Sequence, residues 1–163
     1  MDDWWLVVLQ TVRDEFSDIN DVTQLTRVCI RLLVAVTLGG MLGYERESRG
    51  RSAGLRTHML VALGAALFVL VPLEAGIQPA DLSRVLQGVI AGIGFLGAGA
   101  IIKLDQVQEI KGLTTAASIW MTAAIGVAAG MGRESTAILS TLFALFILAV
   151  LRHVESRHKS DKV

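Results

Sequence analysis

Five stretches of this chain carry almost no formal charge, and each is long enough to cross a bilayer. They cover residues 28–44, 57–73, 85–102, 112–132 and 135–151 of the 163-residue sequence. As α-helices rising ~1.5 Å per residue they would measure roughly 26 to 32 Å, close to the thickness of the hydrocarbon core. A chain this small has too much surface to bury five such helices in a soluble core. We therefore predict an all-α, polytopic transmembrane bundle of about five spans.

The remaining segments define the expected organisation. Residues 1–24 are predicted to form a short amphipathic helix at the membrane interface, because apolar residues recur every three or four positions, followed by a polar turn. Asp21 in that turn is placed to cap the first span. Residues 25–151 then form the five-helix transmembrane domain, and residues 152–163 form a basic tail.

Lysine and arginine are unevenly distributed between the connections, although the 15 basic and 15 acidic residues leave no net charge. The connections after the first and third spans, together with the tail, hold most of the basic residues: Arg46, Arg49, Arg51, Arg56, Lys103, Lys111, Arg152, Arg157, Lys159 and Lys162. Cytoplasmic loops retain such an excess. We expect the N-terminus outside and the C-terminus in the cytoplasm. A neutral chain without a basic stripe does not indicate nucleic-acid binding.

Glycines within the spans predict tight helix packing. Gly39 and Gly43, like two later pairs, are spaced so that backbones can approach closely. The residues expected at such contacts are Gly88, Gly92, Gly94, Gly97, Gly99, Gly126 and Gly130. For the dense run 92–99 two interpretations stay open: either neighbouring helices crowd against it, or the helix breaks there and exposes carbonyl groups.

Polar residues at the ends of spans form the candidate site. Glu45 and Arg46 end the first span and Arg56 begins the second, so the hairpin is expected to bring them together. Two interpretations stay open for Glu45: an ion-pair clamp with arginine, or a metal ligand facing a cavity. Gln87 interrupts the third span and is expected to point inward, where its amide finds a partner.

At the start of the fourth span, hydroxyl groups are expected to cap the helix or bond back to its carbonyls, with Ser118 continuing a polar stripe. The complete candidate polar site is Glu45, Arg46, Arg56, Thr57, Gln87, Lys111, Thr114 and Thr115. His58 is expected at an interface, and no histidine has a nucleophile and an orienting carboxylate at suitable spacing. We therefore expect no enzyme and no cofactor, with Glu45 as the candidate ligand for Mg²⁺.

Four long motifs carry a resemblance to a known family. Residues 43–46, 53–68, 87–99 and 112–120 resemble the MgtC/SapB family of bacterial inner-membrane proteins, and the similarity covers roughly residues 28–150. The resemblance implies a multi-pass inner-membrane protein associated with survival at low magnesium and with virulence. It also implies contact with another membrane complex, such as the F-type ATP synthase.

Two functions follow from the resemblance as alternatives. The first is a regulatory protein whose helices bind another membrane complex. The second is a transporter or channel for Mg²⁺ or another divalent cation, using Glu45 and Gln87, for which a homo-oligomer would supply one carboxylate per subunit. The best-known members carry a soluble domain after the last span, whereas here residues 152–163 follow it, so this chain resembles a short form.

Overall fold

The computed structural model describes residues 4–17, 21–104 and 109–160, which form six helices and a two-stranded ribbon. The contacts divide the chain into two units, Met1–Ile30 and Arg31–Val163. The elements in chain order are α1 (Trp4–Glu15), α2 (Val22–Ser48), α3 (Leu55–Glu74), α4 (Pro79–Gly99), β1 (Ile102–Leu104), β2 (Glu109–Lys111), α5 (Leu113–Gly130) and α6 (Glu134–Ser160).

The first unit holds α1 and the start of α2. Every residue of α1 is exposed, including those of its apolar face. The expected cap of α2 is confirmed, because Asp21 Oδ1 accepts a hydrogen bond of 2.6 Å from the Gln24 amide. Contact of α1 with a membrane surface stays a prediction.

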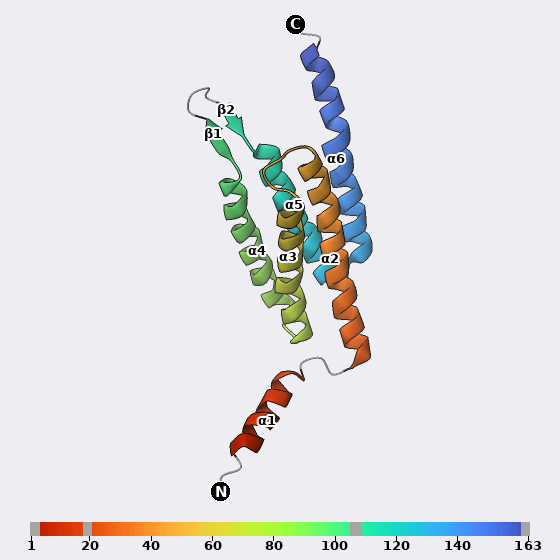
Figure 1. Cartoon of the computed structure of the whole chain (residues 1–163). Coiled ribbons are helices and arrows are strands. Elements are labelled where there is room, and N and C mark those ends of the chain that lie inside the picture. The colour runs from red at the N-terminus through yellow and green to blue at the C-terminus, as the bar shows by residue number, and fades with distance from the viewer. Residues whose placement is uncertain (1–3, 18–20, 105–108, 161–163) are drawn as a thin grey trace. The chain divides into compact units, whose positions relative to one another are not determined.

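The second unit is a helical bundle in which successive helices run in opposite directions (Figure 1). Within the described residues, four helices are long and apolar enough to cross a membrane: α2, α3, α5 and the segment Ala80–Gly99 of α4. The predicted all-α transmembrane bundle is thus confirmed. The described apolar part of α6, Glu134–Ala149, is shorter than the other four, so the fifth span stays a prediction.

A short antiparallel ribbon joins α4 to α5 and was not expected from the sequence. Strand β1 pairs with β2, so that Lys103 lies opposite Ile110. The ribbon extends from the same end of the bundle as the α2–α3 loop (Figure 1). We call this end, with residues 46–56 and the ribbon, the basic end. The side chain of Lys103 and those of the tail lie outside the described residues.

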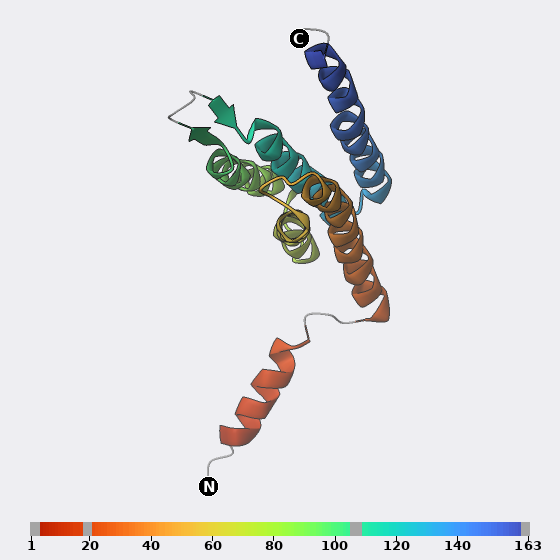
Figure 2. The same cartoon turned by 45° about the horizontal axis from the view of Figure 1, so that its top comes forward.

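Helix α3 lies between α2 and α4 in both views (Figure 1, Figure 2), and its small residues allow close packing. A Cβ on Gly39 of α2 would lie 2.7 Å from Ala62 Cβ. On α5, a Cβ on Gly126 would collide with the Ala62 carbonyl oxygen, and one on Gly130 would lie 2.5 Å from the Ala66 oxygen. The expected packing role of Gly126 and Gly130 is confirmed.

Helix α4 is packed far less than α5, since 11% of its span is buried against 50% for α5. Gly97 is buried and makes ordinary contact with α5, where its Cβ would lie 3.6 Å from Ala116 Cβ. The expected packing role fails for the other four glycines, Gly88, Gly92, Gly94 and Gly99, because nothing lies within 4 Å of a Cβ built on them. They face outward or into a groove, although their spacing matches that of the packed pairs.

The backbone of α4 also decides whether the helix is broken at the run 92–99. The helix is continuous from Pro79 to Gly99 and ends where the Ala100 amide bonds to the carbonyls of Leu96 and Gly97. No carbonyl group of the run 92–99 is therefore freed by a break within the span.

At the end of the bundle opposite the basic end, one arginine joins three helices. Arg31 Nη1 of α2 lies 3.7 Å from Glu74 Oε1 of α3 and donates a 3.4 Å hydrogen bond to the Gly130 carbonyl of α5. A cation at a helix C-terminus is stabilised by the free carbonyls and the helix dipole. Arg31 therefore fixes the mutual positions of α2, α3 and α5 at this end.

Candidate functional site

The basic end holds an ion-pair cluster at the end of α2. Arg46 Nε lies 2.6 Å from Glu45 Oε2, and Arg49 Nε lies 3.1 Å from Glu45 Oε1. The Arg46 side chain is only 3% exposed and that of Glu45 is 13% exposed. Both carboxylate oxygens are therefore engaged by guanidinium groups, and the two cations leave the cluster with a net positive charge.

The expected clamp across the hairpin is not formed. Arg56 is exposed and makes no ion pair with the described residues. The partners of Glu45 are local: Arg46 is the next residue of α2, and Arg49 lies four positions on, in the turn that directly follows the helix. The hairpin is joined instead by Glu47, whose Oε2 accepts a 2.7 Å hydrogen bond from the Leu55 amide at the start of α3.

Sequence reasoning missed the central polar residue of this end, His58. It was expected at an interface, but it is completely buried where α2, α3 and α5 meet. Its Nδ1 lies 2.9 Å from the Gly54 carbonyl oxygen, and a Cβ on Gly43 would lie 3.0 Å from His58 Cβ. A sequence signal existed: His58 shares its helical face with Ala62, Ala65 and Val69, all of which are buried.

Helix α5 contributes a buried row of hydroxyl groups, which confirms the expected polar stripe. Thr115, Ser118 and Thr122 are each less than 5% exposed. Ser118 Oγ donates a 2.8 Å hydrogen bond to the Thr115 carbonyl and lies 3.2 Å from His58 Nε2. Thr122 Oγ1 donates to the Ser118 carbonyl at 2.8 Å.

The hydrogen bonds of His58 define its tautomer. The Gly54 carbonyl can only accept, so Nδ1 carries a proton and donates it. In the neutral ring Nε2 is then an acceptor, and it competes with the Thr115 carbonyl for the single proton of Ser118. In the imidazolium form Nε2 would donate to Ser118 Oγ, and every acceptor in the cluster would be satisfied.

The helix cap expected from threonine is supplied by glycine. Gly112 precedes α5 with a left-handed φ of 96°, and α5 has no side-chain cap. A Cβ on Gly112 would collide with the Ala100 carbonyl oxygen. Both the backbone conformation and the lack of space therefore exclude a larger residue at this position. Of the predicted site residues, Thr115 is buried, whereas Thr57, Lys111 and Thr114 are exposed.

Gln87 was expected to point inward, and it does not. It is exposed on α4, and it lies roughly 18 Å along the helix from the end nearest Glu45. The structure therefore does not bring Glu45 and Gln87 into one site. Among the residues that the structure describes, no group of three or more His, Cys, Asp or Glu side chains could hold a metal ion.

The family model described as the MgtC family matches residues 32–157. The chain belongs to the MgtC family. Together with its four candidate spans, this membership makes it a multi-pass membrane protein.

Individual MgtC relatives are similar over most of this chain. "Protein SrpB" of Synechococcus elongatus is 43% identical over 136 residues, which cover 77% of this chain and 75% of that protein. "Putative magnesium transporter YhiD" of Escherichia coli K12 is 42% identical, and the match covers 78% of this chain and 62% of that protein. "Protein MgtC" of Salmonella typhimurium is 41% identical, and the match covers 78% of this chain and 54% of that protein. The match thus spans between about half and three-quarters of these relatives' lengths, and no solved structure matches the chain.

Proposed function

We propose that this MgtC-family chain is a non-enzymatic protein of the bacterial inner membrane that acts in adaptation to low magnesium by binding another membrane complex. Its similarity to a protein named as a magnesium transporter supports the link to magnesium. The F-type ATP synthase is the candidate complex, and virulence is the candidate setting, that the family resemblance provides. The N-terminus lies outside and the C-terminus in the cytoplasm.

The observation that carries this proposal is the outer face of α4. Gln87, Ala91, Gly94 and Ala98 recur at helical spacing and all are exposed. A primary amide near the middle of a span is unfavourable in lipid unless another helix satisfies it. The small residues beside it allow a partner backbone to approach closely. This face is therefore suited to contact with a transmembrane helix of another chain.

The alternative, cation transport, has less support. A hard divalent cation needs several oxygen ligands, yet both carboxylate oxygens of Glu45 are engaged by arginine. Gln87 is too far along the bundle to share a site with Glu45. The arginines around Glu45 would also repel a cation, which argues against a path through this end.

The proposal is tested by complementation of a deletion strain at low magnesium. We expect Gln87→Leu to lose complementation while the protein still inserts, because the amide contact with the partner is removed. Thr37→Leu is the matched control, since Thr37 is an exposed polar residue within α2. Full complementation by Gln87→Leu would contradict the proposal.

Two further measurements distinguish the proposal from self-association and from cation transport. A photo-crosslinking residue at Ala91 should give an adduct with a different membrane protein, and an adduct only with a second copy would replace the proposed partner by self-association. In proteoliposomes we expect no Mg²⁺ flux that depends on Glu45. Flux that Glu45→Gln abolishes would favour transport.

A further inference from the structure

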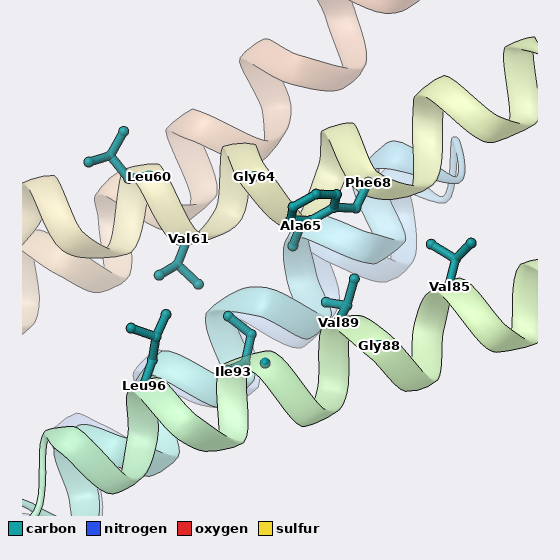
Figure 3. Close-up of a pocket in the computed structure, with 11 residues that line it drawn as sticks. Leu60, Val61, Gly64, Ala65, Phe68, Val85, Gly88, Val89, Ile93 and Leu96 are labelled. Atoms are coloured by element: carbon teal, nitrogen blue, oxygen red, sulfur yellow. The ribbon is translucent and has the colours of Figure 1, made fainter.

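An apolar groove runs between α3 and α4, on a different side of α4 from Gln87. Figure 3 shows its 11 lining residues, which come from these two helices. The groove has a volume of about 670 Å³, and every lining residue is apolar or glycine. Gly64, Gly88 and Gly92 leave it open, since a Cβ on any of them would have nothing within 4 Å.

Next to the groove, toward the basic end, lies a second, more polar cavity of about 420 Å³. Val61 and Leu96 line both cavities, so the two adjoin each other. Ser52 and Thr57 line the second cavity, and both are exposed. The apolar channel therefore has hydroxyl groups at one end, while its other end, at Phe68 and Val85, remains apolar.

Positive charge is concentrated at the polar end. Arg51 directly precedes Ser52 and Arg56 directly precedes Thr57, and both arginines are exposed. Neither makes an ion pair or a side-chain hydrogen bond with the described residues. The N-terminus of α3 adds the partial positive charge of a helix dipole. The Glu47 carboxylate offsets part of this positive charge where it accepts a hydrogen bond from the Leu55 amide. The positive charge on the side of Ser52 and Thr57 is left to attract an anion.

We infer that the groove binds an anionic phospholipid of the bilayer, with one acyl chain between α3 and α4 and the phosphate group at Ser52 and Thr57, close to Arg51 and Arg56. Guanidinium groups bind phosphate through charge-assisted hydrogen bonds. Basic pockets between transmembrane helices at the cytoplasmic side are typical sites for anionic headgroups.

The combination of features favours a lipid over a second protein helix. A helix in the groove would explain the glycines but not the charge at one end. A lipid matches both, because it joins an apolar chain to an anion at a single end. The polarity also fixes the orientation: the bound lipid belongs to the leaflet on the side of the basic end.

The test is native mass spectrometry of the full chain, released from detergent after incubation with phosphatidylglycerol and phosphatidylcholine of identical acyl chains. Each basic residue near an anionic group contributes about fivefold, so two predict a preference of roughly 25-fold for phosphatidylglycerol. The double variant Arg51→Gln, Arg56→Gln should lose this preference. Arg13→Gln, Arg133→Gln, with exposed arginines that line neither cavity, should retain it.

A second pair of variants tests the groove itself. Gly88→Leu should fill the groove and release bound lipid, whereas Gly94→Leu, on the same helix in equally open surroundings, should not. Equal retention of both lipids by the unmodified chain would overturn the inference. So would an unchanged preference in either the arginine or the Gly88 variant, or a dimer that Gly88→Leu dissociates while lipid binding is unaffected.

Discussion

The imidazole Nε2 of His58 lies 3.2 Å from Ser118 Oγ, and this contact joins α3 to α5 within the buried core. On the other side of the ring, Nδ1 is bonded to the Gly54 carbonyl at the start of the same helix. His58 therefore connects the α2–α3 loop to α5 through one side chain. His58 and Ser118 are both buried, so water cannot replace the hydrogen bond between them without opening the bundle.

Ser118→Ala is expected to destabilise the bundle. The substitution removes the hydroxyl that faces His58 Nε2, and a buried polar group left without its partner costs about 1–3 kcal/mol. Thermal unfolding of the detergent-solubilised protein, followed by circular dichroism, measures the change. Ser83→Ala is the control, because the Ser83 hydroxyl bonds only locally at an exposed position. An equal effect of both substitutions would contradict the role given to His58 and Ser118.

Gly130→Ala and Gly94→Ala should have opposite effects. A methyl group at Gly130 would lie 2.5 Å from the Ala66 carbonyl oxygen and must push α5 away from α3, which costs typically 1–3 kcal/mol. At Gly94 nothing lies within 4 Å, so alanine gains up to about 1 kcal/mol of helix propensity. Unfolding temperatures in detergent test the difference. If both substitutions stabilise the protein, α3 and α5 are not packed as closely as the structure indicates.

Glu45→Gln is expected to reduce stability more than Arg49→Gln. Loss of the Glu45 charge leaves the guanidinium of Arg46, which is 3% exposed, without its counter-charge. Breaking a buried ion pair from one side costs about 3 kcal/mol or more. Arg49 is 29% exposed, and its loss leaves Glu45 paired with Arg46. Chemical denaturation in mixed micelles compares the two variants, and the reverse order would show that Arg49 is the more important partner.

The orientation of the bundle can be tested with single cysteines. With Cys29 replaced by serine, Ser52→Cys at the basic end should react with an impermeant maleimide only after the cells are opened. Ser135→Cys, at the opposite end, should react in intact cells. Both positions are exposed, and the excess of basic residues in the α2–α3 loop predicts this sidedness. Labelling of Ser52→Cys in intact cells would invert the topology.

The sequence predicts the helical membrane bundle well, because length without charge is a local property that a bilayer requires of each span. It predicts packing less well. Gly88 and Gly92 have the same spacing as Gly126 and Gly130, yet only the second pair contacts another helix. The spacing shows that a backbone can approach closely, but which helix approaches depends on how the whole bundle assembles.

The sequence predicts only part of the candidate site, because the pairing of its residues also depends on how the bundle assembles. The sequence indicates Glu45 and Arg46 because charge at the end of a span needs compensation, but it does not show that Glu45 pairs locally with Arg49 instead of Arg56. The prediction for His58 is wrong because the residue type suggests an interface, whereas its position on the face of α3 decides that it is buried. That face, shared with Ala62 and Ala65, carried the information that His58 is buried.

The central place of α3 has a consequence for synthesis of the protein. His58 precedes Ser118 by 60 residues, and ribosomes add about 5–20 residues per second. The α3 surface that receives α5 must therefore remain in the bilayer for about 3 to 12 seconds before α5 has been made. During that interval the imidazole and the row of alanines that are buried in the finished bundle face lipid or the insertion machinery. The nascent chain is therefore most vulnerable to quality-control proteases at this stage.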